Sequence, residues 1–474
     1  MSRMTPLDAG FMAMEDADRH VSLGLGTVAI IEGPPPSGEE MRAYAHRALE
    51  RHRRLRLRVR GMGLGLHVPV WEEDPNFSLE HHIRWAALPA PGDEAALRDL
   101  VATELTARLD RDHPLWRLVV VENLAGGRWA MLLLAHHTMV DGVSEITAFE
   151  SLCDPVDGEA ISATGPRENP SRSGLPATRG LLGSMWWALR LPYTVPRTAF
   201  GAIRAAGPVL YAAIAPAEAS SLNGPIGRQR RYAIARTDLP QVREIGAAFG
   251  VTVNDIAVAA IAAAYRRLLL SRGERPAPGK LRIVVPVSRR GADAKAVLDN
   301  RVSAMIPDLP IEIEDPVERL LAVHERIRGH KSSGEVEAER TILTPAQWLP
   351  FWLIATVFRL AAYYPQRGVA ALATNIAGAP HGLAIGGRRV LEMWPCIPIA
   401  LRVRSTIAIL SYVDQLTFGI TGDYDTTPDI DTIASGIRSE ISVLSAHARG
   451  VAAAAELHHH TDTGTGGEQP ADRS

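Results

Sequence analysis

The chain has 474 residues, of which 46% are hydrophobic and 22% are charged, close to the usage of ordinary globular proteins. A chain of this length exceeds the size at which one hydrophobic core keeps growing, so two domains of roughly 200 residues each are expected. The 51 Lys and Arg residues nearly balance the 53 Asp and Glu residues, and the formal net charge is -2. Because the charges nearly balance, the net charge gives no reason to expect a nucleic-acid partner.

The predicted elements alternate between strand and helix in both halves of the chain. The first half is expected to hold a strand, two helices and a hairpin of two strands, at 26–32, 37–54, 93–109, 116–122 and 129–135. The second half is expected to hold three helices and four strands, at 251–271, 281–287, from 315 onward, 370–376, 406–413, 415–422 and 429–446. Ser37 and Glu40 have capping-box spacing, and Gly126-Gly127 is typical of a hairpin turn.

Four segments are predicted along the chain. They are a first domain over 1–155, a linker with an amphipathic helical crossover over 156–225, a second domain over 226–450 and a disordered tail over 451–474. The linker begins where Pro, Gly and Ser replace large apolar residues. Tryptophan-rich runs at 181–215 and 348–358 are compatible with internal packing and with contact at a bilayer surface, and the sequence leaves both open.

Cysteine usage and hydropathy predict a cytoplasmic protein. Cys153 and Cys396 are the only cysteines, too few for a disulfide framework in a chain of this size, and neither has a base nearby in sequence. The N-terminus lacks the basic start and apolar run of a signal peptide. The best apolar run, 348–358, is interrupted by Pro350, so we expect no membrane span.

The segment His136-His137-Thr138-Met139-Val140-Asp141-Gly142 is the strongest candidate for a chemical site. It follows a predicted buried strand and precedes a predicted helix, and such loops hold catalytic groups on a rigid scaffold. A neutral imidazole held by hydrogen bonds can take the proton of an alcohol that attacks a thioester, which makes His137 the candidate general base. Asp141 is expected to brace the loop, and Gly142 to allow a close backbone approach.

Two other interpretations of this segment are possible. A histidine at the end of a strand is more often a structural residue with satisfied hydrogen bonds than a catalyst, but the motif and its place in a loop favour function. His136, His137 and Asp141 are all metal-ligand types, yet adjacent histidines on an extended segment point in opposite directions, so no metal is expected. The run His458-His459-His460 lies in the polar tail and receives no role.

The motif and several shorter segments resemble the bacterial wax ester synthase/acyl-CoA:diacylglycerol acyltransferase family, in the superfamily of chloramphenicol acetyltransferase and peptide-synthetase condensation domains. The resemblance runs from Pro6 nearly to Leu444. Beyond the histidines, it rests on Pro6-Leu7-Asp8-Ala9, Pro114-Leu115-Trp116-Arg117, Asn254-Asp255, Val285-Pro286-Val287-Ser288, Asn300-Arg301-Val302-Ser303 and Thr374-Asn375-Ile376-x-Gly378.

This resemblance implies a mixed α/β fold of two chloramphenicol-acetyltransferase-like domains, with an active-site tunnel at their interface. It implies that His137 is the base, supported by His136 and Asp141, and that acyl-CoA and either diacylglycerol or a long-chain alcohol are the substrates, without a cofactor. Peripheral contact with the inner membrane face or a lipid droplet is a further expectation. Trp116 and Asn254 are candidates for the substrate passage, although core packing and helix capping explain them equally well.

The chain departs from the family pattern in two places. Asp299 stands where a glycine usually precedes Asn300, and Arg404-Ser405-Thr406 replaces the usual Gly-Leu-Asn. We interpret Asp299, Asn300 and Arg404 as candidates for the passage of the alcohol. The departures leave two alternative functions: acyl transfer in specialised lipid or polyketide assembly, and a non-catalytic protein that binds lipid or CoA.

Overall fold

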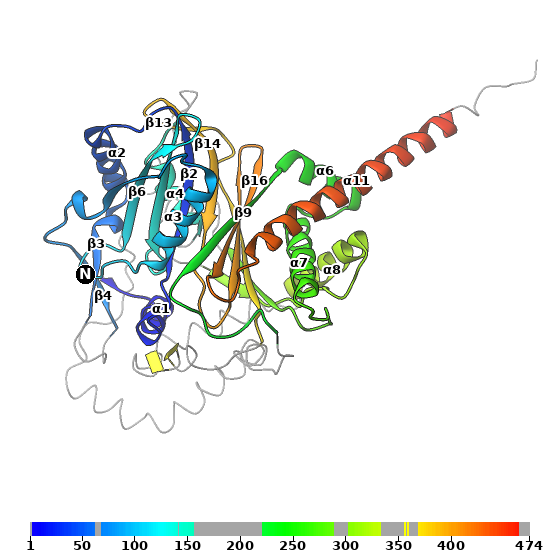
Figure 1. Ribbon diagram of the computed structural model, residues 1–474, viewed down its shortest axis with the longest axis horizontal. Coiled ribbons are helices and arrows are strands. Elements are labelled where there is room, and N and C mark those ends of the chain that lie inside the picture. Colours follow the sequence, from blue (N-terminus) through cyan, green and yellow to red (C-terminus); the bar gives the residue numbers. More distant parts are fainter. Residues whose placement is uncertain are drawn as a thin grey trace, which may run out of the picture.

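The computed structural model describes residues 2–61, 68–140, 142–155, 220–288, 302–332, 355–356, 358–359 and 368–463. Two lobes lie side by side, and each has a mixed sheet with helices packed against it (Figure 1). The predicted mixed α/β fold class is confirmed. Asp141, Asp299, Asn300 and the Trp-rich run at 181–215 lie outside the described residues.

The first lobe is built mainly from the first third of the chain. Its helices are α1 (Pro6–Ala17), α2 (Gly38–Arg51), α3 (Glu94–Thr106) and α4 (Gly142–Glu150), with short 3-10 turns η1 (Arg53–Arg56) and η2 (Leu79–His81). Its strands are β1 (Ser2–Arg3), β2 (Gly24–Glu32), β3 (Leu57–Arg60), β4 (Val70–Glu73), β5 (Ile83–Ala87), β6 (Trp116–Leu124), β7 (Arg128–His136) and β8 (Asp154–Pro155).

The second lobe comes mainly from the rest of the chain. Its helices are α6 (Leu239–Phe249), α7 (Val253–Ser271), α8 (Pro316–Ser332) and α11 (Ile430–Thr463). The strands of this part of the chain are β9 (Arg230–Asp238), β10 (Ile283–Ser288), β11 (Val302–Met305), β12 (Ala371–Ala377), β13 (Leu383–Ile385), β14 (Arg388–Cys396), β15 (Ser405–Tyr412) and β16 (Gln415–Asp423).

The sheets show that the two halves of the chain exchange strands. Within the described residues, a seven-stranded sheet has the order β5-β6-β7-β2-β14-β13-β8, and a six-stranded sheet has the order β11-β10-β12-β15-β16-β9. Strands β13 and β14 therefore belong to the first lobe by pairing, although they come late in the chain. In the register of β14 against β2, Cys396 lies opposite Gly26. A third, small sheet of the described residues joins β1, β4 and β3.

Two hydrophobic cores join the lobes. One core combines the face of β2, β6 and β7 that carries Met131 and Leu133 with second-lobe residues such as Leu410 and Tyr412. A second core places Tyr232 of β9 among residues of α3 and residues on the other face of the seven-stranded sheet. Because each lobe contributes side chains to both cores, burial of apolar surface holds the lobes together as well as folding each one.

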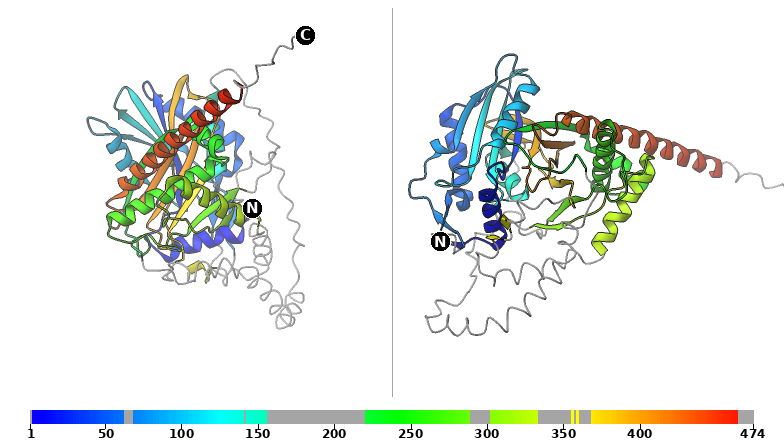
Figure 2. Two further views of the ribbon diagram at one scale, coloured as in Figure 1. Left: turned by 90° about the vertical axis from the view of Figure 1, so that its right-hand side faces the viewer. Right: turned by 60° about the horizontal axis from the view of Figure 1, so that its bottom comes forward.

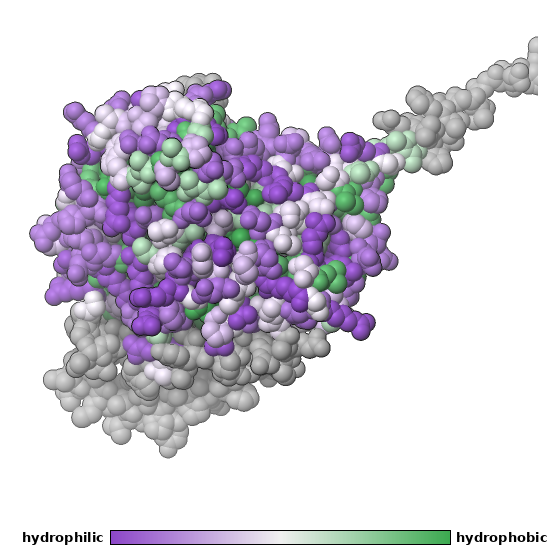
Figure 3. Space-filling model, in the orientation of Figure 1, coloured by the Kyte–Doolittle hydropathy of each residue, from purple (hydrophilic) through white to green (hydrophobic). Residues whose placement is uncertain are grey.

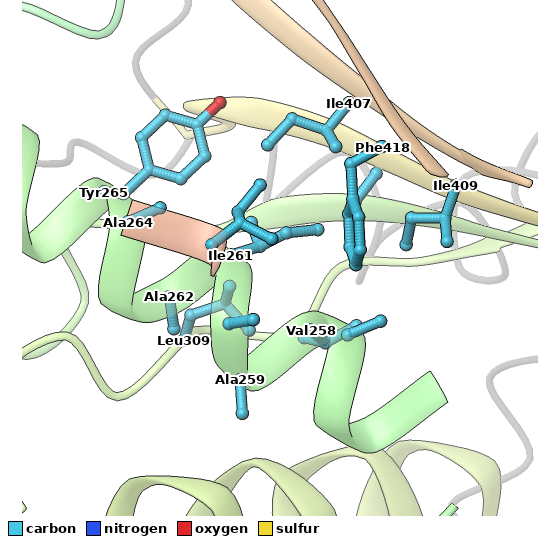
Figure 4. Packing of buried hydrophobic residues seen from close by; sticks show 14 of the residues in the cluster. Val258, Ala259, Ile261, Ala262, Ala264, Tyr265, Leu309, Ile407, Ile409 and Phe418 are labelled. Carbon is cyan, nitrogen blue, oxygen red and sulfur yellow. The ribbon is translucent and has the colours of Figure 1, made fainter. Parts of the chain in front are cut away.

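The second lobe has its own core under α7. Most of this helix is buried, and Val258 and Ile261 pack among Phe418 and Ile409 of the six-stranded sheet (Figure 4). The Tyr265 hydroxyl lies 2.8 Å from the Ser405 hydroxyl, so the polar ends of both buried side chains are satisfied. The helix begins with a capping box between Thr252 and Asp255.

Most predicted elements are found within a few residues of their expected positions, and two corrections are needed. The disordered tail predicted from 451 is wrong for 451–463, where α11 continues to Thr463, because the run Ala452 to Glu456 contains strong helix formers that extend an existing helix. This end of α11 projects from the body in Figure 2. The cap of α7 is Thr252, so the capping role considered for Asn254 is wrong.

Among the described helices, no single one is long and apolar enough to cross a bilayer. Only α6 and α7 together, which meet at an angle of 99°, have the length and composition of a span. The face drawn in Figure 3 is mostly hydrophilic, with hydrophobic areas scattered between polar ones.

A glycine at the junction of the sheets generates a stability prediction. A Cβ at Gly419 of β16 would overlap the carbonyl oxygen of Pro395 in β14, which also accepts a 2.8 Å hydrogen bond from the Tyr232 hydroxyl. Gly419→Ala should therefore lower the free energy of unfolding by about 1–3 kcal/mol. Urea denaturation measures this change.

The control is Gly450→Ala in the exposed part of α11, where nothing lies within 4 Å of the added methyl group. This change should leave stability unaltered or raise it by about 0.5–1 kcal/mol. Equal effects of the two substitutions would contradict the close approach at Gly419.

Candidate functional site

The histidine segment lies where the central hairpin of the first lobe ends. β6 and β7 pair antiparallel, as predicted, and β7 also pairs with β2, so His136 lies opposite Gly24 at the end of the strand. The chain then turns through Thr138 to Met139 and enters α4 at Gly142. The prediction of a strand-to-helix loop is confirmed.

Backbone hydrogen bonds fix the start of this loop on both sides. The N–H of His136 donates to Leu115 O at 2.9 Å, and the N–H of His137 donates to Leu23 O at 3.0 Å. The N–H of Met139 closes a turn onto His136 O at 2.8 Å. Since these bonds reach rigid neighbouring segments, the His137 side chain starts from a fixed backbone position.

His136 is a buried residue with a polar neighbour at each ring nitrogen. Its Nδ1 accepts from the Thr138 N–H at 3.2 Å and lies 2.9 Å from the Thr138 hydroxyl. Its Nε2 lies 3.5 Å from a carboxylate oxygen of Glu15, which is long for a hydrogen bond but within ion-pair range. A ring nitrogen that accepts from an N–H carries no proton, so this geometry assigns the ring proton to Nε2, facing Glu15.

Glu15 is a buried acid on α1 that stays ionised. One carboxylate oxygen accepts from the Leu23 N–H at 3.0 Å, and the other accepts from Arg111 at 2.7 Å. Burial by itself would raise the pKa of Glu15, but the contact with His136, the Arg111 guanidinium and the Leu23 N–H outweigh it and lower the pKa to about 2. The carboxylate thus ties α1, β2 and the first histidine together.

His137 is half-buried and faces an aromatic wall. Its ring centroid lies 4.9 Å from that of Phe11 on α1, and the Phe11 ring meets that of Phe358 at 6.4 Å in an edge-on arrangement. A Cβ at Gly10 would overlap the Phe358 ring, so the absence of a side chain there lets the two segments approach. The candidate base therefore has an apolar side suited to an acyl or alkyl chain.

Arg54 braces the loop from the other direction. Its guanidinium donates to Thr138 O at 2.9 Å and lies over the Trp71 ring, 4.9 Å from the centroid. This contact places a fixed cation at Thr138, within the loop. The role of Asp141 itself remains a prediction.

The other candidate residues lie in different surroundings. Trp116 is buried, stacks on His82 with 4.2 Å between ring centroids and donates its indole N–H to Leu55 O at 2.8 Å, as expected of a core residue. Asn254 accepts a hydrogen bond from Asn375 of β12 at 3.3 Å. Arg404 donates to Ser221 O at 2.9 Å. Their roles in a substrate passage stay predictions, as do those of Asp299 and Asn300.

No metal centre is found among the residues that the structure describes, since no group of three or more His, Cys, Asp or Glu side chains there has suitable geometry. The cysteines are buried, and burial raises the pKa of both thiols well above the usual range. A thiolate nucleophile is therefore disfavoured at either position.

Sequence reasoning missed the contribution of α1. Its start was visible, because Thr5 and Pro6 form a typical cap followed by proline, and the Thr5 hydroxyl accepts from the Asp8 N–H at 3.1 Å. Helical spacing also places Phe11 and Glu15 four residues apart on one face, towards the two histidines. That the helix packs against the histidine loop required the structure.

Glu15→Gln should destabilise the protein by about 2–3 kcal/mol at neutral pH, because the partly buried Arg111 guanidinium and the buried His136 ring lose their anionic partner. The native pKa of Glu15 lies below its unfolded value of 4.5. Its contribution is therefore present above pH 4.5 and is lost as the pH falls towards about 2. Thermal unfolding from pH 7 to pH 3 should show a smaller loss of stability in the variant.

The matched control is Asp16→Asn, which removes the other carboxylate on Arg111 at 2.6 Å but from a half-exposed position. Its effect should stay below about 1 kcal/mol. An Asp16 variant that is as unstable as the Glu15 variant would argue against a special role for the buried acid.

Comparisons with known proteins identify the family of the chain. The wax ester synthase/diacylglycerol acyltransferase catalytic domain matches residues 4–257, and the C-terminal domain of the same family matches residues 298–445. A probable diacylglycerol O-acyltransferase of Mycobacterium tuberculosis is 40% identical over 446 residues, covering 94% of this chain and 96% of that protein. A second putative diacylglycerol O-acyltransferase of that organism is 33% identical over 449 residues, covering 94% and 91%.

Solved structures show the same fold. The wax ester synthase/diacylglycerol acyltransferase of Marinobacter aquaeolei superposes with a TM-score of 0.66 at 24% identity, covering 94% of this chain and all of that one. The first condensation domain of the calcium-dependent antibiotic synthetase gives 0.59 at 17% identity, covering 94% and 97%. With two matching domains and close relatives along nearly its full length, the chain belongs to the wax ester synthase/diacylglycerol acyltransferase family.

Proposed function

We propose that this protein transfers the acyl group of an acyl-CoA to the free hydroxyl of diacylglycerol, giving triacylglycerol, with His137 as the general base. Long-chain alcohols are a second acceptor class, giving wax esters. The observation that carries the proposal is the half-buried His137 on a braced loop beside the apolar wall of Phe11 and Phe358. The membership of the family supports the use of acyl-CoA.

The reaction needs one proton carrier and no covalent acyl-enzyme. The imidazole of His137 takes the hydroxyl proton of the acceptor while the oxygen attacks the thioester carbonyl carbon. When the tetrahedral intermediate collapses, the C–S bond breaks and the sulfur of CoA leaves with the proton returned by His137. The thioester is already activated, so the protein contributes orientation, proton transfer and exclusion of water, without a cofactor.

The supporting residues act through His137. Hydrogen bonds from the loop to Leu115 and Leu23 set the backbone, and Arg54 holds Thr138. A base that must move little during the reaction gains from this support, because misplacement by about 1 Å can cost a hundredfold in rate.

His137→Ala should lower kcat by about 10²–10⁴-fold while the protein stays folded, because the variant has lost the base of the reaction. Release of free CoA thiol from palmitoyl-CoA with diacylglycerol measures the rate. His136→Ala should act mainly through folding, since that ring is buried against Glu15.

The control for the His137 variant is His447→Ala, on the exposed surface of α11. It should leave both rate and melting temperature unchanged. A His137 variant that stays folded and keeps more than about a tenth of the rate would refute the role of the base.

The residues that depart from the family pattern suggest the preferred acceptor. If Asp299 or Arg404 lines the alcohol passage, a bare alkyl chain cannot satisfy these polar groups once water leaves, whereas a glycerol ester can. Diacylglycerol should then give a higher kcat/KM than hexadecanol with the same acyl-CoA. Equal values, or a preference for hexadecanol, would reject this assignment.

Asp299→Gly, which restores the usual family residue, separates the contribution of Asp299 from that of Arg404. If Asp299 sets the preference, the ratio of kcat/KM for the two acceptors should move towards one. Arg404 is held by Ser221 O and faces the Asp423 carboxylate. If Asp299→Gly leaves the ratio of kcat/KM for the two acceptors unchanged, Asp299 does not set the preference, which must then come from Arg404 or another residue.

A further inference from the structure

A second buried acid lies on the other side of the histidine loop. Glu145 is in the first turn of α4, three residues after the end of the motif at Gly142, and its side chain is 1% exposed. The Thr27 hydroxyl of β2 donates to one carboxyl oxygen at 2.7 Å. The other oxygen, Oε1, is buried and has no hydrogen-bond partner among the described residues.

The groups that face this carboxyl carry no positive charge in the described part of the chain. Helix α4 packs against β2 and β12. β2 contributes Thr27, and β14 contributes the uncharged thiol of Cys396, which donates to Gly26 O at 3.2 Å. β12 has no ionisable side chain along Ala371–Ala377, and burial, only partly offset by the Thr27 hydrogen bond, raises the pKa of Glu145 to about 8. At neutral pH the side chain is therefore the protonated acid.

The position of Thr27 links this acid to the reaction. Leu23, the residue just before β2, accepts the His137 N–H, and Thr27 within β2 binds Glu145. The loop from His137 to Gly142 is thus fastened at its start to the residue that leads into β2, and just after its end to β2 itself. A shift of the first turn of α4 away from β2 would move the end of the loop while its start stays fixed.

We propose that Glu145 is a positioning residue of the acyltransferase: as the neutral acid it fastens the first turn of α4 to Thr27 and holds the His137 loop, and its ionisation releases the loop. This role rests on the proposed role of His137 as base. An ionised carboxylate in this buried site would face no cation among the described residues, so it must leave the site or draw water in. Either movement separates α4 from β2.

The raised pKa of Glu145 sets the direction of the pH dependence. Below this pKa the acid is neutral and the loop is held. As the pH rises above it, Glu145 ionises and the loop is released. The ratio of kcat at pH 9 to kcat at pH 7 should therefore be about one tenth in the wild type, because one ionisation with a pKa of about 8 leaves roughly a tenth of the molecules neutral. Initial rates are corrected for thioester hydrolysis without protein.

Glu145→Gln is the deciding variant, because glutamine has the same shape, keeps an oxygen for Thr27 and cannot ionise. Its ratio of kcat at pH 9 to pH 7 should rise to within about twofold of one. A folded variant that keeps the alkaline loss of the wild type overturns the proposal, and so does a wild type without such a loss.

Thr27→Val tests the same contact while Glu145 remains. The Thr27 hydrogen bond fastens α4 and lowers the pKa of Glu145. Its removal should therefore lower kcat at pH 7 and move the remaining alkaline loss of activity to higher pH. An unmoved profile overturns the proposal even if the Gln variant fails to fold. The control is Thr421→Val, which removes a fully buried hydroxyl of β16 and should leave the profile unchanged.

The same assays separate this inference from the proposed function. If His137 is not the base, His137→Ala stays active at pH 7 whatever the Glu145 variants do. If His137 is the base and Glu145 plays no part, His137→Ala is inactive. The loss of kcat between pH 7 and pH 9 is then the same in the wild type and in Glu145→Gln.

Discussion

Strand β2 is the element on which the site and the joining of the two halves both depend. It pairs with β7, which carries His136 at its end, and on its other edge with β14, which comes from the second half of the chain. Both neighbours are antiparallel to it and its residues are almost entirely buried. A shift of β2 by one residue would turn its core side chains to the other face and misalign the histidine loop and the crossover strand together.

Two buried acids flank the loop and are kept in opposite protonation states by their surroundings. Glu15 has Arg111, the Leu23 N–H and His136 around it, and its pKa is lowered to about 2. Glu145 accepts a hydrogen bond from the Thr27 hydroxyl and faces no cation among the described residues, and burial raises its pKa to about 8. The difference comes from the partners and not from the burial, since both side chains are about 1% exposed. A charged anchor on α1 and a neutral anchor on α4 thus fix the loop at neutral pH.

Local patterns were sufficient to predict much of the fold. The capping box at Ser37 and the hairpin around Gly126-Gly127 appear as expected, because both depend on residues close in sequence. The insertion of β14 between β2 and β13 could not be predicted, since a pairing such as Cys396 with Gly26 joins distant residues and leaves no local pattern. Likewise, the motif identified His136 and His137, but Glu15 and Glu145 became visible only when α1 and α4 were placed beside them.

The geometry also explains why adjacent histidines serve different purposes. His136 accepts from the Thr138 N–H at Nδ1 and faces Glu15 with Nε2, so neither nitrogen is left for a substrate, and the residue is 1% exposed. His137 lies one residue beyond the end of β7, where the strand pairing stops and the ring turns towards Phe11 at the apolar wall. A base must meet its substrate and still be held in one orientation. The first histidine therefore supports the loop through buried contacts, which leaves the second accessible and in a fixed position.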